Sequence, residues 1–117
     1  MIPEAIQAAC TACSIPVKDG GWYPSMPPAG KPYAELDDIE RIEFDDGCEL
    51  YTSFHSVTLR LYTLDPATTR VTLRDALFEQ GVPVTNIEVT GQSYETKQFE
   101  TVFSIAGEYK EKWRKNQ

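Results

Sequence analysis

The sequence predicts one α+β domain, in which two helices pack on a largely antiparallel sheet of four to five strands. The chain has 117 residues, which is enough for one hydrophobic core and too few for two. Apolar residues recur with helical periodicity in some segments and alternate with polar residues, as in strands, in others. The segments follow the order helix, strands, helix, strands, which favours helices layered on one face of an antiparallel sheet.

The first expected element is a helix over residues 3 to 14. Pro3 stands at a first-turn position, and Pro16 ends the helical pattern. Apolar residues recur at steps of three and four: Ile2, Ile6, Ala9, Cys10 and Cys13. Residues 17 to 32 are rich in glycine and proline, so we expect a long loop without regular structure there. Loops of that length usually carry a function or are held in place by packing.

The next segments are expected to form a hairpin with a charged tip. Ile42 and Phe44 alternate with charged neighbours, and the turn signal Asp45-Asp46-Gly47 follows them. The carboxylates of this region suggest either a divalent-cation site or a paired acid and base. The residue order of a calcium-binding loop is absent, and carboxylates solvated at a turn are the simpler interpretation.

The clearest strand signal runs from His55 to Thr63. One set of alternating residues is apolar and is expected to face the core: Val57, Leu59 and Leu61. The other set is largely polar: Ser56, Thr58, Arg60 and Tyr62. One face of the sheet is therefore core, and the other face is available for contact with another molecule.

A second helix is expected over residues 66 to 80. Asp65 is a typical N-cap, and Gly81 is a typical C-terminal stop. On a helical wheel, one apolar stripe consists of Leu73, Ala76 and Leu77. A second stripe lies nearly opposite and consists of Ala67, Val71 and Phe78. A helix on a sheet buries one stripe, and leaving Val71 and Phe78 in water forgoes about 1.5 to 3 kcal/mol each.

Two further strands are expected after this helix. The first has two apolar residues on one face: Ile87 and Val89. The second runs from residue 97 to 106 and turns three residues inward: Phe99, Phe103 and Ile105. We assign residues 1 to 107 to the domain and residues 108 to 117 to a charged C-terminal tail with four basic and two acidic residues.

Charge and hydropathy exclude several classes of function. The net charge is −7, which repels phosphates and disfavours nucleic acid binding as the primary role. No apolar run has the length of a membrane helix, and the N-terminus lacks the basic stretch of a secretory signal. We therefore expect a soluble protein with no membrane partner and no sequence-specific nucleic acid partner. A basic tail on an acidic body suits head-to-tail contact between copies, although a solvated tail is the simpler interpretation.

Residues that could support catalysis or cofactor binding are few. Cys10 and Cys13 form a CxxC pair, which suits redox chemistry or, together with Cys48 and His55, a zinc site. Small apolar groups on a buried helical face are the preferred interpretation of these cysteines. No serine lies in a G-x-S-x-G motif, and phosphate-binding glycine motifs are absent. The sequence therefore predicts a protein that is not an enzyme and holds no cofactor.

The second stripe of the helix and the polar side of the sheet are the expected subunit contacts. Aromatic and arginine side chains on an exposed surface favour contact between subunits. The alternative is that the loop around Trp22, or the tail near Trp113, covers the second stripe. The residues predicted to contact other copies are Ala67, Val71, Arg74 and Phe78 of the helix, and Thr58, Arg60 and Tyr62 of the sheet.

The succession of segments after the hairpin forms a recognisable pattern. It comprises the run Phe54 to Thr63, the helix start Asp65-Pro66, a helix that ends in ALFEQGV, and a closing strand from residue 99 to 105. This pattern, within an element order that extends over most of residues 2 to 106, resembles the tail terminator, or tail-completion, proteins of long-tailed bacteriophages.

The resemblance implies a structural role without catalysis or cofactor. Proteins of this family form a ring, typically of six copies, that caps the head-proximal end of the tail tube and stops its polymerisation. The implied partners are further copies of the chain, the tail tube protein and the head connector or neck protein. The implied location is the virion, after assembly in the host cytoplasm. Asp45, Asp46 and Gly47 at the hairpin tip are the residues expected to face the tube or the connector.

Three alternatives stay open. A head-side neck or connector completion protein would also form a ring. A small zinc-binding or thiol-redox module would depend on the cysteines and His55. A monomeric partner-binding domain would form no ring at any concentration.

Overall fold

The computed structural model describes residues 2–23, 25–27, 30–44 and 50–112. Within these residues the element order is α1 (Ile2–Ala12), β1 (Val17–Asp19), β2 (Tyr33–Phe44), β3 (Leu50–Thr63), α2 (Pro66–Glu79), β4 (Val84–Gln92) and β5 (Phe99–Lys112). The five strands form one sheet in the order β1-β2-β3-β5-β4. β1 is parallel to β2, and the other neighbours are antiparallel. The predicted α+β fold with two helices is confirmed.

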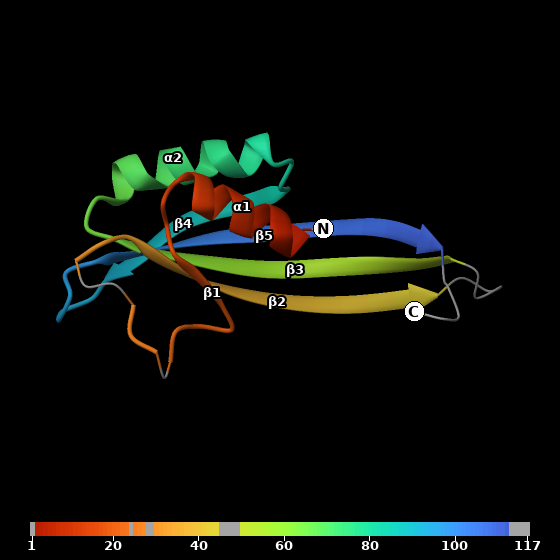
Figure 1. Cartoon of the computed structure of the whole chain (residues 1–117), viewed down its shortest axis with the longest axis horizontal. Coiled ribbons are helices and arrows are strands. Elements are labelled where there is room, and N and C mark those ends of the chain that lie inside the picture. Colours follow the sequence, from red (N-terminus) through yellow and green to blue (C-terminus); the bar gives the residue numbers. More distant parts are fainter. Residues whose placement is uncertain (1, 24, 28–29, 45–49, 113–117) are drawn as a thin grey trace.

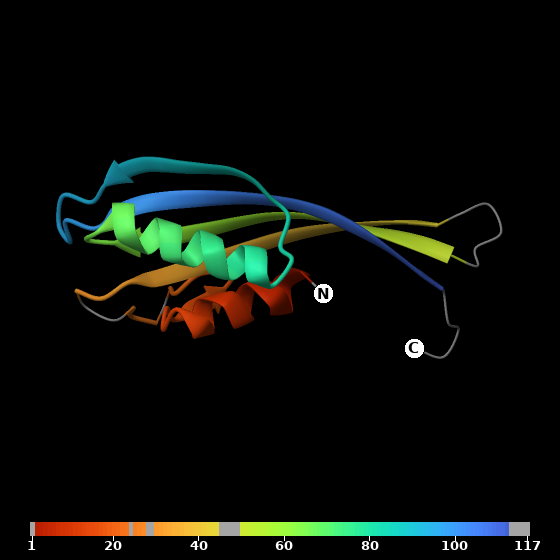
Figure 2. The same cartoon turned by 90° about the horizontal axis from the view of Figure 1, so that it is seen from above.

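The hydrophobic core lies between the helices and one face of the sheet. Figures 1 and 2 show both helices on the same side of the strands. The core residues come from both helices, from the three strands β2, β3 and β5, and from the segments that follow each helix. The main ones are Ile6, Ala9, Cys10, Leu36, Leu59, Leu61, Leu73, Leu77, Phe103 and Ile105. Among the described residues, no helix combines the length and hydropathy needed to cross a membrane.

Local signals place the ends of α2 where the sequence predicts them. The Asp65 side chain accepts a hydrogen bond from the Thr68 backbone N–H at 3.3 Å, which satisfies one of the unpaired donors of the first turn. Gly81 adopts φ +72°, a conformation that glycine enters without steric cost. Its conformation lets the N–H of Val82 donate to the Leu77 carbonyl at 3.0 Å and closes the helix.

The segment from 17 to 32 is not entirely irregular, contrary to the prediction. β1 pairs with β2 over Val17–Asp19. The N–H of Ala34 donates to the Pro16 carbonyl at 2.8 Å, and the N–H of Gly20 donates to the Leu36 carbonyl at 2.7 Å. The glycines and prolines are concentrated after β1, so they do not interrupt this short parallel pair.

The last strand extends into the segment predicted as a charged tail. β5 continues through residues 108–112, where it pairs with the first residues of β3. β3 itself begins at Leu50, five residues before the strand expected from His55. The sequence of residues 50–54 and 108–112 gives only a weak strand signal. The two segments are strands because each supplies hydrogen-bond partners for the backbone of the other.

The three long strands extend beyond the helices as a projection that we call the arm. The arm consists of residues 39–44 of β2, 50–56 of β3 and 106–112 of β5. Figures 1 and 2 show these strands continuing to one side of both helices. The molecule is accordingly elongated, with extents of 53 × 30 × 23 Å. The hairpin tip with Asp45, Asp46 and Gly47 lies outside the described residues.

Candidate functional site

The face of the sheet opposite the helices, which we call the uncovered face, is the first candidate site. Thr58, Arg60 and Tyr62 of β3 lie on it, because the residues between them face the core. The register places Tyr33 and Glu100 on either side of Tyr62. The structure therefore brings the three sheet residues predicted for a contact onto one surface and adds neighbours from β2 and β5.

Aromatic side chains cover the end of this face near β1. The rings of Tyr33 and Tyr62 stack with centroids 4.9 Å apart. Trp22 meets the Tyr33 ring edge-on at 6.0 Å and donates its indole N–H to the Ala34 carbonyl at 2.8 Å. The part of the loop around Trp22 is thereby fixed against the sheet beside Tyr33, which leaves the second stripe of α2 without this cover.

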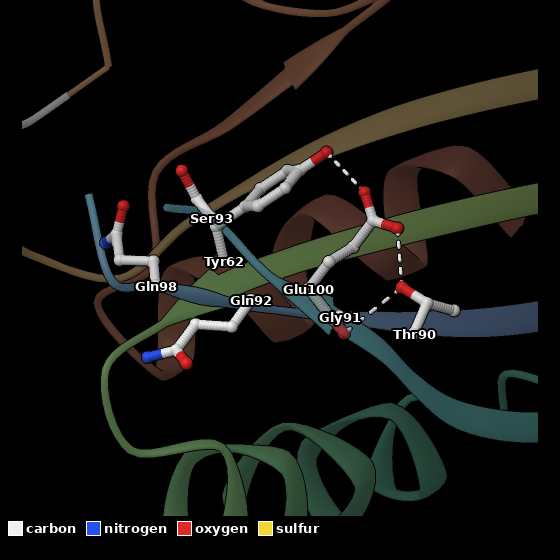
Figure 3. A pocket seen from close by; sticks show the side chains of 7 residues that line it. All are labelled: Tyr62, Thr90, Gly91, Gln92, Ser93, Gln98 and Glu100. Atoms are coloured by element: carbon white, nitrogen blue, oxygen red, sulfur yellow. Dashed lines mark hydrogen bonds between the residues drawn. The ribbon is translucent and has the colours of Figure 1, made fainter. Parts of the chain in front are cut away.

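Glu100 is the centre of a hydrogen-bond network beside this cluster (Figure 3). The Tyr62 hydroxyl donates to Glu100 Oε2 at 2.7 Å, and the Thr90 hydroxyl donates to Oε1 at 2.6 Å. The hydrogen bond from Thr90, the bond from Tyr62 and the nearby Arg60 lower the pKa of Glu100 against an opposing effect of burial. Burial and the bond to Glu100 raise the pKa of Tyr62. Glu100 is therefore a fixed negative charge on the uncovered face.

A shallow pocket of about 310 Å³ opens next to this network. Its lining comes from the end of β3 and from the hairpin of β4 and β5: Tyr62, Thr90, Gly91, Gln92, Ser93, Gln98 and Glu100. Figure 3 shows the Glu100 carboxylate directed toward the hydroxyls of Tyr62 and Thr90. Both carboxylate oxygens are thus already bonded within the protein, which suits a polar contact surface better than acid-base chemistry.

Arg60 is neutralised on the same face. Its guanidinium forms an ion pair with Asp37 of β2. The hydrogen bond to Asp37 is the main reason that the pKa of Arg60 is raised. The Arg60 side chain stays partly exposed, so the pair can meet another molecule without separation of its charges.

The outer side of α2 is the second candidate surface. Leu73 and Leu77 are fully buried, whereas Val71 is 38% and Phe78 is 59% exposed. Ala67 is exposed on the same stripe, and Arg74 forms an ion pair with Asp75 at 3.1 Å. The two stripes expected from the helical wheel therefore exist, and the described part of the chain does not bury the outer one.

A buried polar cluster on the arm was missed by the sequence reasoning. The His55 imidazole lies 3.2 Å from the Ser53 hydroxyl and 3.0 Å from both carboxylate oxygens of Asp38. Glu40 also accepts a hydrogen bond from Ser53 and lies 3.3 Å from His55 Nε2. The sequence did contain a signal for this cluster. It places a serine and a histidine two residues apart on one strand and carboxylates on the other strand of the predicted hairpin. No G-x-S-x-G motif accompanies them.

The order serine, histidine, aspartate in this cluster has the form of a hydrolase triad, but its accessibility does not suit catalysis. Ser53 is 0% and His55 is 3% exposed. A substrate carbonyl must reach the serine oxygen for acyl transfer. The cluster instead joins β2 to β3 by satisfied hydrogen bonds on the face of the arm that continues the core.

The cysteines of the described chain are packing residues. Cys10 belongs to the core, and burial raises its pKa to about 12. Burial also raises the pKa of Cys13, whose thiol lies 3.7 Å from the Thr72 carbonyl. Cys48, a predicted partner in a zinc site, lies outside the described residues. The described residues contain no group of three or more His, Cys, Asp or Glu side chains placed to hold a metal ion.

Comparison with known proteins does not assign the chain to a family. No protein-family model matches the sequence, and no curated protein matches it. The function is therefore inferred from the surfaces of the molecule.

Proposed function

We propose that the protein is a structural subunit of a ring that ends the tail tube of a long-tailed bacteriophage and joins it to the head connector. The observation that carries the proposal is the exposed outer stripe of α2. Phe78 and Val71 remain 59% and 38% exposed, and covering such side chains is worth about 1.5 to 3 kcal/mol each when burial is complete. A neighbouring copy of the chain supplies that cover, in agreement with the family that the sequence resembles.

The position of the candidate surfaces supports a ring. The outer stripe of α2 lies on the helix side of the domain, and the uncovered face with Arg60 and Tyr62 lies on the opposite side of the sheet. Unlike surfaces on opposite sides favour a heterologous contact, which forms a ring when its rotation closes. The net charge of −7 suits a ring that DNA passes through without binding.

The chemistry of the cysteines weighs against the zinc or thiol-redox alternative. A thiol is a nucleophile or a metal ligand only when it loses its proton. Cys10 is buried and has its pKa raised to about 12, so it stays protonated at neutral pH. The ring subunit remains the better proposal.

The association part of the proposal is tested by sedimentation velocity at micromolar protein concentration. The wild type is expected to sediment as a closed oligomer, and Phe78→Glu as a monomer. Thr72→Glu is the matched control, because Thr72 is an exposed α2 residue outside the outer stripe, and the variant gains the same charge. A wild-type monomer at every concentration would overturn the proposal.

The capping part is tested with a tail tube protein that polymerises in vitro. Electron micrographs are expected to show the ring at one end of each tube, and tubes assembled with an excess of the protein are expected to be shorter. Binding to isolated connectors without binding to tubes would identify the head-side neck protein instead.

A further inference from the structure

We infer that the arm joins neighbouring copies by strand pairing, with the outer edge of β2 in one copy adding to the outer edge of β5 in the next. The inference deepens the proposed ring function, on which it rests, by naming the contact. Three features carry it: two open backbone edges, an acidic excess on the β2 edge that disfavours pairing between like edges, and exposed isoleucines on the β2 edge.

The first open edge belongs to β2. The N–H of Ala34 and the carbonyl of Leu36 point away from β3, because they bond to the β1 side at 2.8 and 2.7 Å. In an antiparallel ladder this outward direction recurs at every second residue. β1 pairs no further than Leu36. The outward backbone groups of Glu40 and Ile42 therefore face no strand among the residues that the structure describes.

The second open edge belongs to β5. The carbonyl of Ser104 and the N–H of Ala106 point toward the β4 side, where they bond to Thr85 and Pro83. β4 pairs with β5 only as far as Ile105. The same alternation directs the backbone groups of residues 108, 110 and 112 away from β3, and no described strand lies beyond them. Within the described residues, the arm is thus a three-stranded ribbon that is open on both sides.

The two edges fit each other in direction. β2 and β5 are both antiparallel to β3, so they run the same way through the arm. In copies related by rotation about an axis along the arms, β5 of one copy meets β2 of the next as a parallel pair. Because the two edges differ, the contact is heterologous and repeats around a ring.

Charge selects this pairing over pairing between like edges. The β2 edge from residue 37 to 43 contains four acidic residues and one basic residue. The β5 edge from residue 106 to 112 contains two basic and two acidic residues and so carries no net charge. Two β2 edges would repel each other, whereas β2 against the uncharged β5 edge meets no such repulsion. Charge on an edge strand can also serve to prevent pairing, and this explanation predicts a monomer.

Exposed apolar side chains on the β2 edge indicate that this edge pairs with another strand and is not protected against pairing. Ile39 is 71% exposed on one face of the arm, and Ile42 is 47% exposed on the other. A strand added at the usual spacing of about 4.8 Å covers part of both side chains.

The test removes one outward N–H from each edge of the full-length chain. Ile42→Pro deletes a donor on the β2 edge without loss of a bond between β2 and β3, and proline is tolerated on edge strands for this reason. Ile42→Ala is the matched control, because it shortens the side chain and keeps the N–H. Lys110→Pro and Lys110→Ala form the corresponding pair on β5. Sedimentation velocity gives the oligomeric state, and circular dichroism verifies the fold.

The wild type and both alanine variants are expected to form the closed oligomer, and each proline variant is expected to be a folded monomer. Mixing the two proline variants is expected to give a dimer that grows no further, because one intact β2 edge and one intact β5 edge remain. Misfolded variants would not complement each other in this way. Where proline alters the circular dichroism, Ile39→Lys replaces Ile42→Pro. A charge at a side chain that the added strand covers is expected to lower association at least tenfold.

Two results would overturn the inference. A closed oligomer formed by Ile42→Pro, or the absence of a dimer in the mixture, excludes the edge contact and leaves the proposed ring function intact. A wild-type chain that stays monomeric at every concentration excludes the ring and the edge contact together.

Discussion

The Tyr62 hydroxyl donates to Glu100 Oε2 at 2.7 Å, and this bond joins two residues that stand 38 positions apart in the sequence. The two residues are register partners on β3 and β5. Thr90 bonds the other oxygen of Glu100 at 2.6 Å from β4. Three strands of the uncovered face are therefore linked through one carboxylate, whose lowered pKa makes the linkage sensitive to acid.

The Glu100 carboxylate is expected to contribute stability above its unfolded pKa of about 4.3. Its folded pKa is lowered, so its contribution is lost as the pH falls through that folded value. Glu100→Gln is expected to reduce the free energy of unfolding at pH 7 and to flatten the fall of this free energy at acidic pH. Urea unfolding from pH 7 to pH 3 measures both effects. The exposed Glu95→Gln is the control, and equal pH profiles for Glu100→Gln and wild type would contradict the prediction.

Substitutions in the two stripes of α2 are expected to have different effects: those in the buried stripe lower stability, and those in the outer stripe weaken association. Leu77→Ala removes a fully buried side chain and is expected to lower the free energy of unfolding by about 2 to 5 kcal/mol. Phe78→Ser is expected to change it little, because the side chain is mostly exposed, but to weaken association. Chemical denaturation and sedimentation equilibrium give the two quantities. A large loss of stability in monomeric Phe78→Ser would mean that the side chain belongs to the core.

Most of the fold follows from local sequence signals. Asp65 and Gly81 predict both ends of α2, and the alternation of Val57, Leu59 and Leu61 predicts which face of β3 is buried. These signals act within a few residues, so one sequence is sufficient to detect them. The strand β1 and the continuation of β5 depend instead on partners that are distant in sequence.

The candidate site was predictable only in part for the same reason. Arg60 and Tyr62 were placed on the outer face from alternation alone. Their partners Asp37 and Glu100 depend on the register between strands, which no local pattern determines. The grouping of Ser53 and His55 with Asp38 likewise requires the register of a hairpin whose turn lies in residues 45–49.

The buried cluster of the arm is expected to be structural. Ser53→Ala removes the buried hydroxyl that donates to Glu40 and contacts His55, and it is expected to lower the free energy of unfolding by about 1 to 3 kcal/mol. A fluorophosphonate probe is expected to leave native Ser53 unlabelled, because the residue is fully buried. Ser56→Ala, at an exposed position of the same strand, is the stability control. Labelling of the native protein that Ser53→Ala abolishes would instead indicate a catalytic serine.

The thiols of Cys10 and Cys13 are expected to be inert in the folded protein. In a Cys48→Ser background only Cys10 and Cys13 remain, and burial raises the pKa of both. Ellman's reagent at pH 7 is expected to react slowly with the native variant and rapidly with both thiols in denaturant, because the thiolate is the reacting form. Adding Cys10→Ser leaves Cys13 as the only thiol and separates the two rates. A fast native reaction of Cys10, or stoichiometric zinc in the wild type that Cys10→Ser and Cys13→Ser remove, would contradict the packing role and favour the thiol or zinc module.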